Sequence, residues 1–133
     1  MFGYDNKHVV TCHVGDPTKD MDLLIYRAPC KCEVMAAYIV DNVGLAAGTE
    51  NYFEVALKNA GTSGTATTAM AAALGGTPAS GTAPAWTVNV PQTFTISEGT
   101  LASGEWVKAD YDETGTCAQN ITIVLEVVYG VAA

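Results

Sequence analysis

Apolar and polar residues alternate along most of this chain, and a period of two fits β-strands and not helices. In residues 50–60 (ENYFEVALKNA), Phe53, Val55 and Leu57 alternate with polar or amphipathic side chains. The same period recurs in residues 105–113 (EWVKADYDE) and 120–130 (NITIVLEVVYG). Successive side chains of a strand point to opposite faces of its sheet, so each segment has one apolar face to bury. The alternation therefore predicts an all-β protein.

Glycine-rich turn signals separate these segments and indicate an antiparallel β-sandwich or barrel. They cluster at residues 59–65, 75–84 and 97–105, and short strands between such turns are typical of both folds. A chain of 133 residues is long enough for one domain with its own core. We divide it into an N-terminal arm with the first strand (1–20) and a sandwich domain (21–133).

Residues 21–28 (MDLLIYRA) and 32–40 (CEVMAAYIV) are apolar on both faces. This pattern is typical of strands in the middle of a sheet, or of strands covered by a neighbour. We expect residues 86–90 (WTVNV) and 93–97 (TFTIS) to be short strands, and we favour a strand over a helix for the alanine-rich segment 65–74. The predicted core comprises Leu24, Tyr26, Val34, Phe53, Val55, Leu57, Phe94, Ile96, Val107, Ile121, Ile123 and Leu125.

The charge balance excludes several classes of partner. The chain has 14 acidic and 6 basic residues, and its formal net charge of −8 repels the phosphates of nucleic acids and of anionic membranes. Residues 1–16 lack a basic segment followed by an apolar one, and no apolar run is long enough for a spanning helix. We therefore expect a chain synthesised in a host cytoplasm, with no nucleic-acid partner and no membrane partner.

The stretch RAPCKCEV (27–34) holds two of the four cysteines, Cys30 and Cys32. A zinc site would need Cys12 and Cys117 to complete four ligands, and the paired C-x₂₋₄-C spacing of such sites is absent. A redox C-x-x-C motif is absent as well. We therefore expect no bound metal, and the cysteines are either buried thiols or partners in a disulfide.

A jelly-roll topology would bring particular cysteines together. In such a sandwich we expect the strand near 21–29 to pair antiparallel with the last strand, near 119–129. The end of the 21–29 strand then lies beside the start of the last strand, which places Cys30, or alternatively Cys32, close to Cys117. Four cysteines allow three connectivities, which the sequence leaves open. We predict a structural disulfide between Cys30 and Cys117, formed on exposure to an oxidising environment.

No combination of residues in the sequence indicates catalysis. The two histidines, His8 and His13, both lie in the expected first strand, and the motifs of phosphate-binding loops, serine hydrolases and zinc proteases are absent. Asp110 and Asp112 would share one face of a strand, and their oxygens suit calcium, but the spacing is not that of a known loop. We interpret them as a solvated acidic rim, and we expect no enzymatic activity and no cofactor.

The order of the segments resembles small jelly-roll virion proteins of tailed bacteriophages, of the capsid decoration (cement) and head-fibre type. One strand ends in Ala-Pro, and CEVMAAYIVDN (32–42) follows. Next come a Gly/Ala loop and TENYFEVALKNAGTSGTAT (49–67), whose Lys-Asn-Ala-Gly is similar to a Lys-Asn-Gly element of these proteins. QTFTISEGTLASGEWVKADYDETGT (92–116) and the final ITIVLEVVYG (121–130) complete the resemblance, which spans about 21–130.

The resemblance implies a jelly-roll β-sandwich on the capsid surface of a virion. Such a protein binds between capsid subunits and stabilises the particle, so its partners would be the major capsid protein and further copies of itself in a homotrimer. The alternative is a carbohydrate- or receptor-binding β-sandwich module of a tail fibre or spike, with Trp86, Trp106, Tyr52 and Tyr111 as candidate aromatics. A cupin-like enzyme would need clustered histidines in mid-chain, which this sequence lacks.

The N-terminal segment MFGYDNKH carries two large aromatic residues, Phe2 and Tyr4. The segment is too short and polar to fold alone, and aromatic side chains are enriched at the energetic centres of interfaces. We therefore predict that residues 1–7 dock on a neighbouring subunit or on the capsid surface, with Phe2 and Tyr4 as the contacts.

Overall fold

The computed structural model of the chain describes residues 7–17, 20–76 and 81–130, which form strands and no helix. The strands are β1 (Lys7–Gly15), β2 (Asp20–Arg27), β3 (Cys32–Asp41), β4 (Tyr52–Asn59), β5 (Thr68–Ala69), β6 (Leu74–Gly75), β7 (Gln92–Phe94), β8 (Thr100–Leu101), β9 (Trp106–Thr114) and β10 (Asn120–Tyr129). The all-β class predicted from the alternation is confirmed. The segment 65–74 forms no helix and is mostly irregular, with β5, a single bridge at Ala71 and the start of β6 as its only paired residues.

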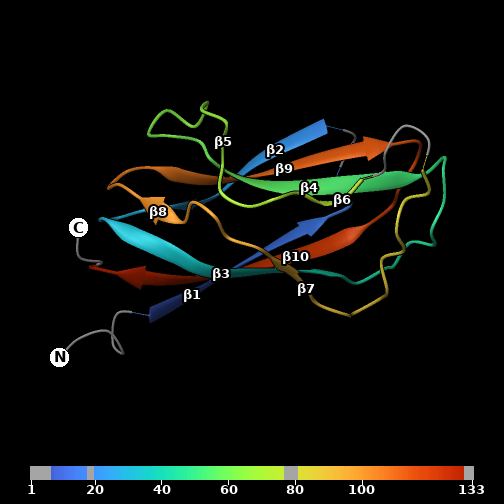
Figure 1. Cartoon of the computed structure of the whole chain (residues 1–133), viewed down its shortest axis with the longest axis horizontal. Coiled ribbons are helices and arrows are strands. Elements are labelled where there is room, and N and C mark those ends of the chain that lie inside the picture. Colours follow the sequence, from blue (N-terminus) through green and yellow to red (C-terminus); the bar gives the residue numbers. More distant parts are fainter. Residues whose placement is uncertain (1–6, 18–19, 77–80, 131–133) are drawn as a thin grey trace.

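The strands form two antiparallel sheets of five strands each. Sheet A has the order β1-β10-β3-β7, and β8 also pairs with β3. Sheet B has the order β2-β9-β4-β5, and β6 also pairs with β4. In Figure 1 the strands of sheet B occupy the upper part of the view and those of sheet A the lower part. The chain therefore alternates between the two layers, as β1 and β3 belong to sheet A and β2 and β4 to sheet B.

The core lies between the sheets and consists of the apolar faces of the alternating strands. Phe53, in the middle of it, stacks on Trp86 on one side and on Tyr111 on the other, with ring centroids 4.4 and 5.3 Å apart. The predicted core residues are buried except for Tyr26 and Ile96, which pack partly buried against the core, and Leu24, which is 43% exposed.

β2 differs from its prediction in position and in partner. It was expected in mid-sheet or covered by a neighbour, and paired with the last strand, whereas it is the edge strand of sheet B and pairs with β9. A register shift between Leu24 and Tyr26 explains the misleading apolar run. Because of this bulge, Ile25 and Tyr26 both pack against the core, and Leu24 faces outward. The last strand, β10, pairs with β1 and β3 instead.

Residues 86–90 do not form the predicted strand. Trp86 makes a single bridge to Leu45, and the chain then turns. Asn89 has a φ of 61°, and its N–H donates to the carbonyl oxygen of Asp41 at 2.9 Å. Asparagine adopts this left-handed conformation more readily than most residues. The turn at Asn89 therefore interrupts the strand that Val88 and Val90 led us to expect.

Asp41, whose carbonyl oxygen accepts from Asn89, also forms a buried polar pair with Gln119. With its side-chain nitrogen turned toward Asp41, Gln119 donates hydrogen bonds to the Asp41 carboxylate. The nitrogen then lies 3.1 Å from Oδ1 and 2.6 Å from Oδ2. The N–H of Val43 also donates to Asp41 Oδ1 at 3.0 Å. Asp41 and Gln119 are both buried, and a buried carboxylate without donors would destabilise the fold. This pair therefore holds the end of β3 to the segment before β10.

The chain packs closely around Gly75, the last residue of β6. Its φ is 83°, and a Cβ there would lie 2.4 Å from the carbonyl oxygen of Phe53 and 2.9 Å from Cζ2 of Trp86. We expect Gly75→Ala to lower the free energy of unfolding by about 2 kcal/mol or more, from strain and displaced core atoms. Urea denaturation followed by tryptophan fluorescence measures the change.

Gly48→Ala is the matched control, because the nearest atom to a Cβ at Gly48 is 3.9 Å away. This variant should change the free energy of unfolding by less than about 0.5 kcal/mol. Equal losses in the two variants would contradict the packing described at Gly75.

Candidate functional site

The outer face of sheet A carries few charges and mixes aliphatic side chains with threonine, histidine and tyrosine. The strand register aligns Thr11, Val124, Tyr38 and Thr93 in one row from β1 to β7. These side chains point away from the core, because they alternate with the buried residues of the same strands. We call this surface the sheet A face, and it comprises Val9, Thr11, His13, Ala36, Tyr38, Val40, Thr93, Thr122, Val124 and Glu126.

Charges on the outer face of sheet A gather at one end, where Lys7, Glu126 and Glu33 lie in two neighbouring rows. Glu126 forms an ion pair with Lys7 at 2.9 Å. Val9 is 63% exposed on β1, and Met35, the extra residue of the β3 bulge, is 55% exposed. Single exposed apolar residues are ordinary, but a contiguous apolar patch on a folded domain marks an interaction surface. This face has the chemistry to bind a flat apolar protein surface.

The outer face of sheet B has the opposite character. Asp20, Asp112 and Glu54 stand opposite one another across β2, β9 and β4, and Asp22 stands opposite Asp110 in the next row. We call these five carboxylates the acidic rows. Only the pair on β9 was predicted from the sequence, because the other carboxylates come from strands far away along the chain. Like charges placed directly opposite each other in a sheet destabilise it.

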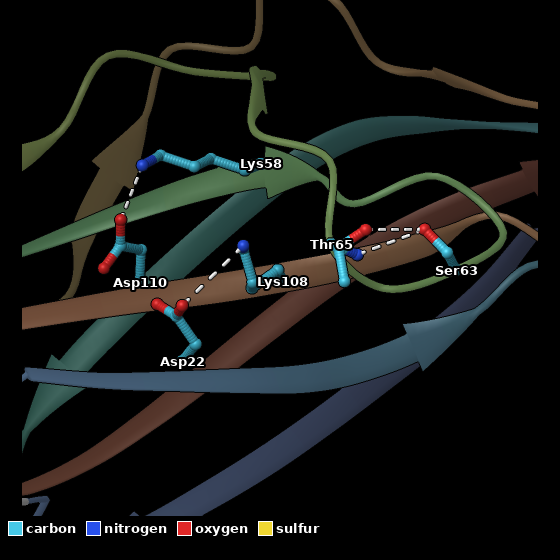
Figure 2. Close-up of polar contacts among 6 residues, drawn as sticks. All are labelled: Asp22, Lys58, Ser63, Thr65, Lys108 and Asp110. Atoms are coloured by element: carbon cyan, nitrogen blue, oxygen red, sulfur yellow. Dashed lines mark hydrogen bonds and ion pairs between the residues drawn. The ribbon is translucent and has the colours of Figure 1, made fainter.

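Two lysines offset part of this charge (Figure 2). Lys58 Nζ lies 2.5 Å from Asp110 Oδ2, and Lys108 Nζ lies 3.8 Å from Asp22 Oδ2. Partial burial of Asp110 opposes ionisation, but the hydrogen bond from Lys58 and the positive charges of Lys58 and Lys108 outweigh it and lower the pKa of Asp110. Among the described residues no lysine forms an ion pair with Asp112, and burial and the negative charges of Asp110 and Asp20 raise its pKa.

The described residues contain no group of three or more His, Cys, Asp or Glu side chains placed to hold a metal ion. A hollow of about 310 Å³ lies over residues 45–51. One loop lines it, and Glu50 is the single ionisable residue of that loop, so the hollow brings no nucleophile and base together. Within the described ranges, no helix has the length and apolarity needed to cross a membrane.

The aromatic residues considered for a glycan site do not form a row. Trp86 and Tyr111 are buried in the core. Trp106 and Tyr52 are partly exposed on sheet B, but Trp106 begins β9, whereas Tyr52 pairs with Thr114 at the other end of β9. A sugar-binding platform needs adjacent exposed rings, and these four residues do not supply one.

The two histidines lie on β1 and take part in local contacts. The ring of His8 packs on Tyr129 with centroids 4.1 Å apart, and His13 Nδ1 lies 3.1 Å from the Thr122 hydroxyl. Both residues are exposed, as the sequence suggested. Phe2 and Tyr4, the predicted interface residues, lie outside the described residues.

The arrangement of the cysteines contradicts the predicted disulfide. Cys32 begins β3 opposite Tyr129, the last residue of β10, whereas Cys117 precedes the first residue of β10. The ten residues of β10 separate the two ends by about 30 Å, at roughly 3.3 Å per residue. A disulfide requires Cα atoms within about 7 Å, so neither Cys30 nor Cys32 can reach Cys117. The error came from pairing the 21–29 strand with the last strand.

Cys30 and Cys32 instead lie at one end of the sandwich, beside a pair of tyrosines. Tyr26 and Tyr129 share a hydrogen bond between their hydroxyls, 2.5 Å apart. Cys32 is fully buried, and burial together with the nearby Cys30 thiol raises its pKa, while a hydrogen bond to Tyr26 acts in the opposite direction. Cys30 is exposed. The two thiols are therefore expected to differ strongly in reactivity.

The chain matches no protein-family model and no curated protein closely enough to assign it to a family.

The acidic rows predict a stabilising substitution. We expect Asp112→Asn to raise the free energy of unfolding at pH 7 by about 0.5 kcal/mol, because it removes repulsion from Asp110 and Asp20. A carboxyl whose pKa is raised by folding destabilises the fold once it ionises, so this gain should shrink as the pH falls and disappear below about 3.9, the ordinary pKa of an unfolded Asp. Urea denaturation across this pH range measures it.

Glu98→Gln serves as the matched control, since Glu98 is exposed and lies outside the acidic rows. It should leave the stability at pH 7 unchanged within about 0.3 kcal/mol. A loss of stability in Asp112→Asn at pH 7 would mean that the Asp112 carboxylate is held by favourable contacts.

The cysteines predict an order of chemical labelling. In the folded protein, a maleimide should modify Cys30 at least about tenfold faster than Cys32, because the reactive thiolate of Cys32 is buried and disfavoured. Mass spectrometry of digested samples taken over time gives both rates, and labelling in urea should remove the difference. Resistance of Cys30 to labelling until a reductant is added would show that it is bridged.

Proposed function

We propose that this protein is a non-enzymatic virion structural protein that decorates the outer surface of a phage capsid. It stabilises the particle by binding between subunits of the major capsid protein. The observation that carries this proposal is the sheet A face, where uncharged side chains of three long strands form a flat surface suited to protein contact. The resemblance of residues 21–130 to decoration proteins supplies the kind of partner.

The strand orders support a jelly roll as the finer topology. A jelly roll is a double-sheet sandwich with two Greek keys, and it is found in viral capsid proteins. Orders β1-β10-β3-β7 and β2-β9-β4-β5 interleave the first half of the chain with the second half in both sheets, as successive Greek keys require. Because this fold also occurs in lectins and in cupins, the proposed role rests on the surface and not on the fold.

The two outer faces suggest an orientation on the particle. The sheet A face docks on the capsid, because burial of apolar side chains favours association. The acidic rows face the solvent, where their charge is hydrated and contributes to solubility. In this orientation the protein covers the joints between capsid subunits and links them.

A charge in the centre of the sheet A face tests the proposal. Val124 lies in mid-strand on β10, between Thr11 and Tyr38. We expect Val124→Lys to weaken binding to purified capsids of the parent virus by at least about tenfold, because a buried unpaired ammonium is costly. Sedimentation of capsids with added protein, over a range of concentrations, gives the occupancy and the dissociation constant.

Ala56→Lys is the matched control, because Ala56 holds the equivalent mid-strand position on β4, on the outer face of sheet B. It should leave capsid binding unchanged. Equal weakening in both variants, or no binding of the wild-type protein to capsids, would overturn the proposal. Saturable binding of the free protein to glycans, without binding to capsids, would select the carbohydrate-binding alternative.

A further inference from the structure

The free edge of β1 is the longest unprotected strand edge in the described part of the chain. β1 pairs with β10 on one side only, over nine residues without a register shift. Its sequence, KHVVTCHVG, has no proline, and Lys7 at its start is the only Lys, Arg, Asp or Glu in it. An edge strand presents a row of unpaired N–H and C=O groups, which is a template for another strand.

The other sheet edges carry the features that prevent such pairing. β2 has Asp20, Asp22 and Arg27 and the bulge at Leu24. β5, β6, β7 and β8 are only two or three residues long. Short strands, charges and bulges are the usual means by which proteins block edge-to-edge association. Of these features β1 has only the charge of Lys7 at its first residue, so most of its edge is open to pairing with another strand.

The sequence of β1 is complementary to itself in antiparallel orientation. With Thr11 opposite its own copy, Val9 faces His13 and Val10 faces Cys12 of the second copy. Val9, Thr11 and His13 then continue the sheet A face, and Val10 and Cys12, which are only partly buried in the single chain, cover each other. The Thr11 pair joins two β-branched side chains, and the other pairs place a valine beside an imidazole or a thiol; cross-strand side-chain contacts of this kind stabilise strand pairs.

Charge supports the same register. Lys7 is opposite the uncharged Gly15 of the second copy, because the two chains run in opposite directions. No two like charges of β1 therefore stand opposite each other in this pairing. A pairing about a twofold axis is also the commonest closed symmetry of homo-oligomers.

We propose that β1 pairs antiparallel with β1 of a second copy about a twofold axis at Thr11, so that the two A sheets become one continuous sheet. The pairing satisfies the free N–H and C=O groups of both edges. It also joins two sheet A faces into one apolar surface. This dimer differs from the homotrimer expected from the sequence, and it does not depend on the proposed capsid role.

Like charges at the twofold axis test the pairing. In Thr11→Lys the two ammonium groups would face each other across the axis. We expect the wild-type full chain to sediment as a dimer of the 13.8 kDa subunit, and Thr11→Lys to raise the dimer dissociation constant at least about tenfold. Sedimentation equilibrium is run with a reductant, so that the exposed Cys30 cannot link two chains.

Thr93→Lys is the control, because Thr93 lies in the same row of the same face but on β7, at the opposite margin of the sheet. It should leave the dissociation constant unchanged. Circular dichroism of both variants shows whether they are folded. A wild-type monomer at about 100 μM, a trimer at any concentration, or equal weakening by Thr93→Lys would overturn the proposal.

Hydrogen exchange of the wild-type protein gives a readout that needs no variant. The outward N–H groups of β1 should exchange more slowly as the protein concentration rises, because pairing protects them. The N–H groups on the outer edge of β2 should show no such dependence. Exchange at β1 that is independent of concentration between about 1 and 100 μM would contradict the pairing.

Discussion

Sheet A depends on the pairing between β3 and β10, two strands that are separated by about 80 residues of chain. Ile39 stands opposite Ile123 and Ala37 opposite Leu125, and these residues are all fully buried. Every other strand of sheet A pairs with one of these two. Joining strands so distant along the chain has a large entropic cost before any side chain is buried. The ladder is therefore stable only when the core between the sheets packs at the same time.

The two sheets share one core, but their outer faces carry different kinds of side chain. In sheet B the outward positions carry charges, and the acidic rows arise because β2, β4 and β9 bring their carboxylates side by side. In sheet A the outward positions carry Val124, Tyr38 and Val40, which are as apolar as many core residues. Sheet A therefore has more apolar surface than one core can bury. A surface of this kind supports binding by contact, and the joined A sheets of a dimer would double its area.

Features that are decided within one strand could be predicted from the sequence, whereas features that depend on bulges or on strand pairing could not. The burial of Phe53, Val55 and Leu57 was predicted because alternation along one strand decides it. The position of β2 was wrong, since its bulge is invisible in the residue pattern and moves Ile25 and Tyr26 onto the same face. The predicted bridge from Cys30 to Cys117 failed for a related reason, because it relied on a strand pairing that the sequence does not specify.

The sequence by itself determined the class of the fold and the buried face of the regularly alternating strands β4, β9 and β10, since a period of two leaves each strand one apolar face to bury. It also determined that β3 is apolar on both sides. Only the tertiary structure decided which strands are neighbours, and with that the acidic rows, the sheet A face and the separation of the cysteines. The physical reason is that a strand's own residues specify which face is buried, whereas its partner depends on the packing of the whole core.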